Sequence, residues 1–416
     1  MGESRVSYLG ELRRNVRPLA AASLGVGTSL PLFAYTNSIF APHLIKAFGW
    51  SRAEFALIGI TMLIMLPFLP IIGRWTDRFG VRRVALIGSL LILPGFIGYS
   101  LMGGNLYAYF ALFTFVLIIG SMTGTLVYTR VVAENFTQAR GLALTIVNCA
   151  PAALAAPLLP LLNMLILTIG WRLSYVLLGA LCCLCGLVAV ALVPKTSGQV
   201  IDREAASEPV AETVATGTSR DDYRLILRSG LFWLILVATF LCLLQTQLHS
   251  SQMNLMLIDQ GLTTQGAANI ASIYVLGTLV GRVACGLALD RFSTPLVTFF
   301  SMIIPAIGFV ILGTSFDAFT VIAVAMFLVG LSVGAETDIM PFIVARYFKM
   351  RIYNTTLGLH MIAAFLASAV GALGVSYTLA RYDSFEPFLF VIAGSIVIGS
   401  TLFLLMPKAR DYPKIG

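Results

Sequence analysis

The chain has 416 residues, of which 58% are hydrophobic and 11% charged, and its formal net charge is +8. A soluble domain has roughly 25% charged residues, so this composition excludes a soluble protein and indicates an integral membrane protein. The positive charge does not indicate nucleic-acid binding, because an excess of Lys and Arg on cytoplasmic loops, facing anionic headgroups, explains it. We therefore expect membrane lipids as partners and no nucleic acid.

Apolar runs of about 20 residues, long enough to cross a bilayer as helices, recur along the whole chain. Barrel strands are not expected, because they alternate in polarity over about 10 residues, whereas these runs are apolar throughout. The predicted fold class is all-α integral membrane, with twelve transmembrane helices. The predicted spans are 19–41, 53–73, 84–103, 105–129, 141–169, 172–193, 231–258, 267–289, 295–315, 318–344, 353–380 and 385–406.

The charged segment GRWTDRFGVRR, residues 73–83, lies between the second and third predicted helices. Its first glycine, its aspartate and the arginine that follows recur 213 positions later, between the eighth and ninth. A repeat at half the chain length indicates two copies of one unit, as in transporters built from repeats. The matching pairs are Gly73 with Gly286, Asp77 with Asp290, and Arg78 with Arg291.

A polar segment separates six predicted helices from six, which gives two six-helix pseudo-repeats. It occupies residues 194–229, is rich in Ser, Thr, Ala and Glu, and is typical of a flexible linker. The predicted domains are an N-terminal six-helix bundle (1–193), this cytoplasmic linker and a C-terminal six-helix bundle (230–416).

The placement of Lys and Arg predicts the orientation, because cytoplasmic flanks carry the excess. With the N-terminus inside, all of the 27 basic residues except Lys46, Arg52, Arg172 and Arg381 lie on the inner face. Both termini are therefore predicted to be cytoplasmic.

No soluble segment is large enough for a catalytic domain, because none exceeds the linker. The chain also has no HExxH metal site and no P-loop for ATP. We therefore expect a protein that is not an enzyme, has no cofactor and no metal, and is driven by a gradient.

Residues 73–83 with Leu86 resemble the loop between helices two and three of the major facilitator superfamily, which reads GxLxDRxGRRxxL. Trp75 stands where that loop usually has an aliphatic residue. The match accompanies twelve spans, a half-length repeat and a central linker. The resemblance implies two six-helix bundles around a central cavity, with alternating access.

Within that superfamily the chain is similar to bacterial oxalate:formate antiporters and monocarboxylate transporters, at residues 40–52, 139–143 and 170–175. The similarity implies a monomeric transporter in a bacterial inner membrane. The matching segments do not identify the substrate. From the charged residues described below we expect a small organic anion, a monocarboxylate, moved by proton symport or by exchange for a counter-anion. The alternatives are a proton-driven exporter of hydrophobic or cationic compounds and, from another class, a non-transporting membrane receptor.

Arg282 is an ionisable residue within the eighth predicted helix, where a charge costs roughly 2.5 to 3.5 kcal/mol on insertion scales. Its counterpart in the first repeat is Leu69, so the repeat does not require it. The resemblance implies that Arg282 binds the substrate carboxylate, which a guanidinium can hold through two parallel hydrogen bonds. A structural ion pair, or a side chain extending to the inner membrane surface, is the alternative.

His360 in helix eleven stands where oxalate transporters have an anion-binding lysine. Histidine titrates near neutral pH, so Arg282 together with His360 would suit a monocarboxylate and would link its binding to that of a proton. A neutral His360 bonded to a neighbouring helix is the alternative.

Glu336 and Asp338 in helix ten are about 200° apart around the helix, so they cannot both face the cavity. Desolvation disfavours the charged form of a buried carboxylate, so either residue could carry the proton, with Arg282 or Arg130 as its partner. A static latch near the inner gate is the alternative. The aspartate of monocarboxylate transporters four residues before the arginine is Thr278 here, so their proton relay does not carry over.

Further polar residues are candidates for the substrate cavity, or else are packed and hydrogen-bonded within the bundles. Gln245 and His249 are four residues apart and are predicted to share one helical face. The candidates are Tyr35, Asn37, Tyr128, Gln245 and His249.

The repeated charged segments are expected to latch an inner gate. Gly73 and Gly80 would permit a sharp turn, and Asp77 and Asp290 would each meet the N-terminus of a helix in the other half, worth about 0.3 to 2 kcal/mol. Ordinary positive-inside turn chemistry is the alternative. The predicted gate residues are Gly73, Asp77, Arg78, Arg82, Arg83, Gly286, Asp290 and Arg291.

Overall fold

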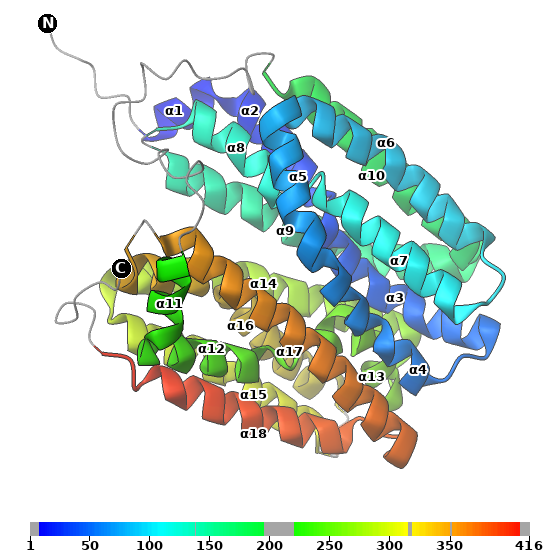
Figure 1. The fold of residues 1–416 in the computed structure, drawn as a ribbon. Helices are drawn as coiled ribbons and strands as arrows, with labels where there is room; N and C mark the ends of the chain where they lie inside the picture. Colours follow the sequence, from blue (N-terminus) through cyan, green and yellow to red (C-terminus); the bar gives the residue numbers. More distant parts are fainter. Residues whose placement is uncertain (1–7, 138, 195–219, 315–317, 350–351, 408–416) are drawn as a thin grey trace, which may run out of the picture. The chain divides into compact units, whose positions relative to one another are not determined.

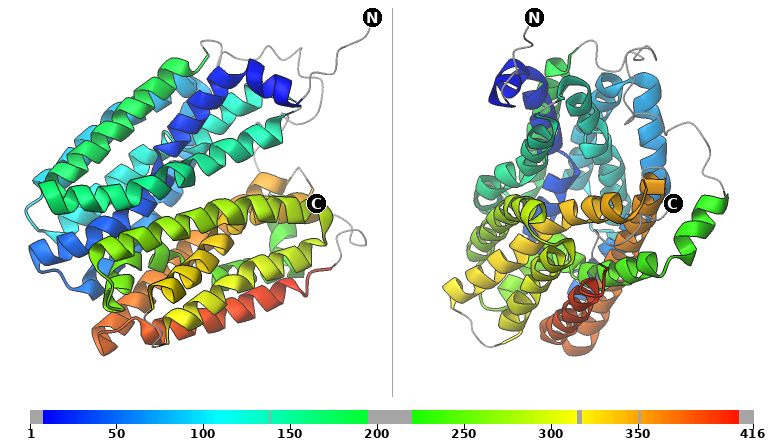
Figure 2. Two further views of the ribbon diagram at one scale, coloured as in Figure 1. Left: turned by 180° about the vertical axis from the view of Figure 1, so that it is seen from behind. Right: turned by 90° about the vertical axis from the view of Figure 1, so that its left-hand side faces the viewer.

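The computed structural model describes residues 8–137, 139–194, 220–314, 318–349 and 352–407. These residues contain 12 helical spans that are long and apolar enough to cross a membrane. This confirms the predicted fold class (Figure 1 and Figure 2). The first, second and fourth spans continue several residues beyond their predicted ends. Most of the predicted linker, 195–219, lies outside the described residues.

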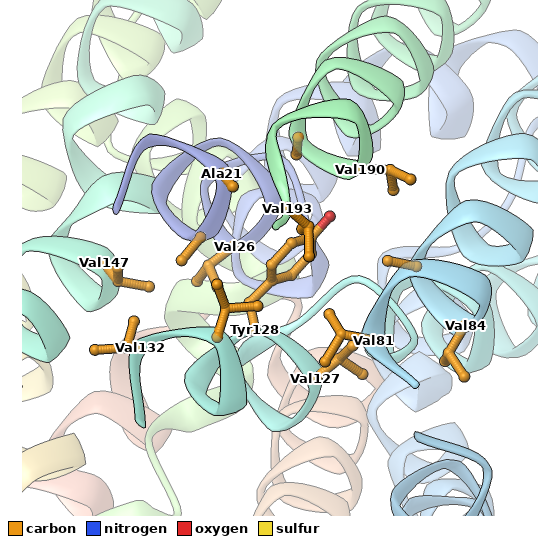
Figure 3. Packing of buried hydrophobic residues seen from close by; sticks show 14 of the residues in the cluster. Ala21, Val26, Val81, Val84, Val127, Tyr128, Val132, Val147, Val190 and Val193 are labelled. Carbon is orange, nitrogen blue, oxygen red and sulfur yellow. The ribbon is translucent and has the colours of Figure 1, made fainter. Parts of the chain in front are cut away.

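One compact unit is formed within residues 1–50 and 64–201. Its core is an apolar cluster that contains Val26, Val127 and Tyr128 (Figure 3). Its helices are α1 (Tyr8–Arg14), α2 (Val16–Gly27), α3 (Leu30–Phe48), α5 (Met65–Phe79), α6 (Val81–Leu101), α7 (Leu106–Ser121), α8 (Thr125–Asn135), α9 (Arg140–Ile169) and α10 (Trp171–Leu192).

The other compact unit is formed within residues 51–63 and 202–416, so the second span begins in this unit and continues in the first. The change of unit coincides with eight residues of 3₁₀ helix, η1. The helices are α4 (Arg52–Ala56), η1 (Leu57–Ile64), α11 (Arg220–Arg228), α12 (Gly230–Leu243), the π-helix η2 (Leu248–Gln252), α13 (Met253–Asp259), α14 (Thr264–Arg291), α15 (Thr294–Leu312), α16 (Phe319–Tyr347), α17 (Tyr353–Tyr382) and α18 (Glu386–Phe403).

The first, fourth and seventh spans are interrupted, whereas the sequence predicted continuous helices. The breaks fall between α2 and α3, between α7 and α8, and between α12 and α13. At each break a hydroxyl bonds a carbonyl three or four residues before it: Thr28 to Leu24, Thr123 to Gly120, and Thr246 to Leu243. Such bonds offer the backbone an alternative to the regular helix, which hydropathy does not detect.

The segment 73–83, predicted as a loop, is almost entirely helical. α5 continues to Phe79 and α6 begins at Val81, so the turn is Gly80 alone, at φ 78°. Only glycine adopts this conformation without strain from a Cβ. The expectation that Gly73 shapes the turn is wrong, because Gly73 lies inside α5, and Gly286 likewise lies inside α14. Charged residues marked the end of the apolar run but not the end of the helix.

Candidate substrate and proton site

Glycines bring the backbones of α14 and α16 into contact where the two helices lie side by side (Figure 1). A Cβ added at Gly281 would collide with the backbone of Leu331, and one added at Gly334 would collide with the backbone nitrogen of Arg282. Small residues at such spacing permit close packing of membrane helices. Because Gly334 is one turn before Asp338, this contact decides which side chains of α16 face Arg282.

The same stretch of α16 contains Gly330-Leu331-Ser332-Val333-Gly334, which matches the GxSxG pattern of hydrolase nucleophiles. In those enzymes the serine projects from a strained turn between a strand and a helix. Here the segment is helical, Ser332 is 1% exposed, and both glycines pack against the α14 backbone. The pattern therefore serves helix packing, and it gives no reason to infer an enzyme.

Arg282 contacts two side chains of α16. Its Nη2 donates a hydrogen bond to Oγ1 of Thr337, and its Nε lies 3.5 Å from Oδ2 of Asp338. A charged hydrogen bond is about 2.7 to 2.9 Å long, so the contact with Asp338 is a longer ion pair. The ion pair considered as an alternative for Arg282 is thus present, and an incoming carboxylate would have to compete with Asp338.

Glu336 and Asp338 face different helices. Glu336 lies close enough to Cys242 of α12 to act on its thiol electrostatically, whereas Asp338 acts on Cys285 of α14 and on Arg282. Within the described part of the chain, Glu336 has no ion-pair partner. Asp338 is therefore the carboxylate whose charge is coupled to Arg282.

His360 is 2% exposed on α17 and packs edge-on against Phe232 of α12, with 5.2 Å between ring centroids. Its Nδ1 lies 2.9 Å from the Thr356 carbonyl of its own helix, to which it donates. Nε2 has no hydrogen-bond partner among the described residues. This hydrogen bond stays within α17, so the bond to a neighbouring helix that the alternative required is not the one found. His360 contacts α12, whereas Arg282 contacts α16.

Gln245 and His249 do not share the face of a regular α-helix, which corrects the prediction. Gln245 lies in the turn after α12, and His249 lies in the π-helix η2. The His249 ring instead stacks on Tyr274 of α14, at 5.7 Å between centroids and 28° between planes. Sequence reasoning did not find Tyr274, because only the π-turn rotates His249 towards it.

The candidates in the first and fourth spans belong to the N-terminal unit. The Asn37 Oδ1 accepts a hydrogen bond of 2.8 Å from the Tyr109 hydroxyl, inside that unit. Tyr128 is fully buried in the apolar cluster (Figure 3). Its ring packs against Gly25. Tyr35 is half-buried on α3. Asn37 therefore matches the packed, hydrogen-bonded alternative. Tyr128 is packed, but its hydroxyl has no hydrogen-bond partner among the described residues.

Asp77, the central predicted gate residue, binds Arg130 of its own unit, with 2.8 Å between Oδ1 and Nη1. The Arg130 Nε also lies 3.0 Å from Oε1 of Glu134. Asp77 and Arg130 border a cavity of about 400 Å³ between α5, α8 and α9, which Arg140 also lines. Arg130 is therefore engaged by Asp77 and Glu134, and its predicted partnership with helix ten is not needed to explain it.

The other predicted gate residues lie at helix ends. The Arg78 guanidinium lies over the Phe79 ring, 5.4 Å from its centroid. Arg82 and Arg83 are in the first turn of α6, and Arg291 ends α14 and is exposed. The Asp290 backbone belongs to α14, but its side chain lies outside the described part of the structure.

An arginine clamp that the sequence reasoning missed holds α4 within the C-terminal unit. The Arg52 guanidinium lies 2.7 Å from Asp259, which ends α13, and 2.6 Å from Asp383, which caps α17. It also donates to the Asp383 carbonyl. Asp383 has φ 51°, the one positive φ of a non-glycine residue in the described chain. In the sequence, Arg52 was notable as one of four basic residues outside the inner face and as the last residue of the segment 40–52, and neither feature indicated its partners.

A second missed feature is a latch between α1 and the connection from α8 to α9. The Glu11 carboxylate accepts hydrogen bonds from the backbone of Thr137 and of Ala139, each 2.7 Å long. The Asn15 amide donates to the Asn135 carbonyl at 2.8 Å. Glu11 of α1 therefore binds the connection that leads into α9, and Asn15, between α1 and α2, binds the end of α8. The helices α8 and α9 carry Arg130 and Arg140.

A family model described as Major Facilitator Superfamily matches residues 22–372, more than four fifths of the chain. The chain belongs to this superfamily. Together with the 12 spans, this membership makes it a multi-pass membrane transporter. The predicted recognition is thereby confirmed.

Two sequence relatives of this Major Facilitator Superfamily member carry named substrates. It is 24% identical over 367 residues to the 4-hydroxybenzoate transporter PcaK of Pseudomonas putida, with 80% of each chain covered. It is 27% identical over 286 residues to monocarboxylate transporter 11 of Homo sapiens, covering 67% of this chain and 57% of that protein.

Solved structures of the superfamily share the fold. The D-xylose-proton symporter is 16% identical with a TM-score of 0.68, over 97% of this chain and 99% of that one. The nucleoside transporter NupG is 13% identical with a TM-score of 0.70, over 97% and 100%. At such identities the likeness concerns the fold alone.

Proposed function

We propose that this protein is a proton-coupled symporter of a small monocarboxylate in a bacterial inner membrane, with both termini cytoplasmic. The observation that carries the proposal is Arg282, a guanidinium inside a membrane helix that is paired with Asp338 across α14 and α16. The two sequence relatives support the substrate class, because their names specify 4-hydroxybenzoate and monocarboxylates, substrates with one carboxylate group.

The coupling follows from competition for Arg282. A substrate carboxylate that takes two hydrogen bonds from the guanidinium displaces Asp338, and the displaced aspartate is then a desolvated charge without its partner. A charge in that position is costly, so Asp338 takes up a proton when substrate binds. Release of the substrate restores the ion pair and returns the proton. Binding of anion and proton is therefore linked through one arginine.

The test is uptake of radiolabelled benzoate and lactate into proteoliposomes with an imposed pH gradient. Arg282→Lys keeps the charge but loses the planar fork, so substrate affinity is expected to fall about tenfold, which corresponds to about 1.4 kcal/mol. Arg381→Gln, an exposed arginine at the end of α17, is the matched control and should transport normally. Unchanged affinity and rate in Arg282→Lys and Arg282→Ala would exclude the anion site.

Glu336 gives a reason to retain the exporter of cationic compounds as a second candidate. It is a carboxylate within a membrane helix, with no ion-pair partner in the described chain, and such a group can attract a cation. Counterflow with a lipophilic cation separates the two functions. If counterflow of the cation requires Glu336 and does not change when Arg282 is substituted, the exporter function would replace the monocarboxylate proposal.

A further inference from the structure

The interrupted segment of the seventh span places polar side chains where none would be expected in a membrane helix. Gln245 is 1% exposed and Gln252 is not exposed at all. Three of its buried polar atoms, Oε1 of Gln245, Nδ1 of His249 and Oε1 of Gln252, have no hydrogen-bond partner among the described residues. A buried polar group without a partner costs about 1 to 3 kcal/mol, so three in eight residues require an explanation.

Gln247 in the same segment has a structural role, because its side-chain amide is hydrogen-bonded within the protein. Its Nε2 donates to the Ser251 hydroxyl at 2.5 Å and to the Ala56 carbonyl at 3.3 Å, which ties η2 to α4. Gln245 and Gln252 are as deeply buried as Gln247, and His249 is partly buried. Each of the three leaves one buried acceptor atom without a hydrogen bond among the described residues. The segment therefore contains one glutamine that holds the fold together and three residues with unused hydrogen-bonding capacity.

The π-helix determines where these side chains point. A π-turn widens the helix and is frequent at functional sites. Here it brings the His249 ring against Tyr274 of α14, which lies eight residues before Arg282 on the same helix. At about 1.5 Å per residue, Tyr274 and Arg282 are about 12 Å apart along the helix axis. That separation, less the reach of the side chains, is one that a single aromatic ring with a substituent at each end can bridge.

We propose that Gln245, His249 and Gln252, called here the polar subsite, bind a hydroxyl group at the end of the substrate opposite its carboxylate. This inference rests on the proposed function, in which Arg282 binds the carboxylate. A hydroxyl both donates and accepts hydrogen bonds, so it can satisfy a glutamine oxygen and a histidine nitrogen together. The substrate class is therefore a hydroxylated aromatic monocarboxylate. The site would bind this substrate in one fixed orientation.

The experiment measures the affinities of 4-hydroxybenzoate and 4-methylbenzoate, two ligands of the same shape that differ in this hydroxyl. Competition against radiolabelled benzoate in proteoliposomes gives both values. Wild type is expected to bind the hydroxylated ligand at least tenfold more tightly, because the methyl group leaves the polar subsite unsatisfied. Gln252→Leu should reduce this ratio towards one, whereas Gln247→Met, the structural control, should preserve it.

The outcomes separate the two proposals. Equal affinities of wild type for both ligands, with binding still dependent on Arg282, would overturn the polar subsite alone. A ratio that survives both Gln252→Leu and His249→Phe would do the same. Failure of every carboxylate to bind would overturn the proposed function itself. Because the wild-type ratio is decisive, the test does not depend on the folding of any variant.

Discussion

The guanidinium of Arg282 and the carboxylate of Asp338 are paired across two helices whose backbones meet at Gly281 and Gly334. Each charge lies within a membrane-spanning helix, where an unpaired charge is costly. Removing one partner therefore exposes the other to that cost, which exceeds what the pair itself contributes. Under the proposed function, the substrate replaces Asp338 as the partner of Arg282, and a proton neutralises the released Asp338.

The two acidic residues of α16 are expected to differ in their effect on pH dependence. Asp338→Asn removes the group that exchanges with substrate at Arg282, so accumulation driven by an inward proton gradient should be lost while substrate exchange at equal pH persists. Glu336→Gln should retain gradient-driven uptake. Uptake and counterflow at several external pH values measure both. The reverse result would assign proton transfer to Glu336.

Helix packing at Gly334 is expected to be intolerant of a single methyl group. In Gly334→Ala the Cβ meets the backbone of α14, and such overpacking costs about 1 to 3 kcal/mol. Gly286→Ala, with no neighbour within 4 Å of its Cβ, is the control on α14. We expect a lower midpoint of thermal unfolding in detergent, and weaker benzoate binding, for Gly334→Ala only. Equal behaviour of the two variants would show that the contact does not position Arg282.

The α1 latch is expected to order the connection between α8 and α9. Glu11→Ala removes the acceptor of both backbone hydrogen bonds, so amide exchange of residues 137 and 139–143 should accelerate about tenfold, equivalent to about 1.4 kcal/mol. Arg14→Gln, an exposed change on the same helix, is the control. Hydrogen exchange followed by mass spectrometry measures the effect. Unchanged amide protection would mean that Glu11 does not stabilise the start of α9.

The Arg52 clamp is expected to contribute unequally through its two carboxylates. The Asp259 side chain is 29% exposed and that of Asp383 is 88% exposed, and exposed ion pairs contribute only about 0 to 1 kcal/mol. Double-mutant cycles with Arg52→Gln should therefore give a larger coupling energy with Asp259→Asn than with Asp383→Asn. Raising the salt concentration should weaken the Asp383 coupling more. Equal couplings would contradict the role assigned to exposure.

The positions of the spans could be predicted because hydropathy is a property of each segment alone. Burying about 20 apolar residues in a bilayer requires no knowledge of neighbours, and the observed helices lie where the apolar runs do. The turn at Gly80 was located to within a few residues for the same reason. The shape of the turn was not predicted, because α5 continues through its charged residues to Phe79.

The interruptions of the first, fourth and seventh spans could not be predicted from hydropathy. Gln245 and His249 have the spacing of one helical face in the sequence, yet a turn and a π-helix separate them in the structure. Those deviations depend on local hydroxyl bonds and on contacts such as Gln247 with Ala56, which lie 191 positions apart. The polar subsite therefore became visible only in three dimensions.

The sequence by itself determined that the protein crosses the membrane twelve times, belongs in a transporter fold and buries a costly charge at Arg282. These conclusions follow from the free energy of placing each residue type in a bilayer, which is local to the chain. Only the tertiary structure decided that Asp338, and not Glu336, faces that charge. The reason is that the glycine contacts between α14 and α16 fix the rotation and register of two helices far apart in sequence, and those two quantities select the partner.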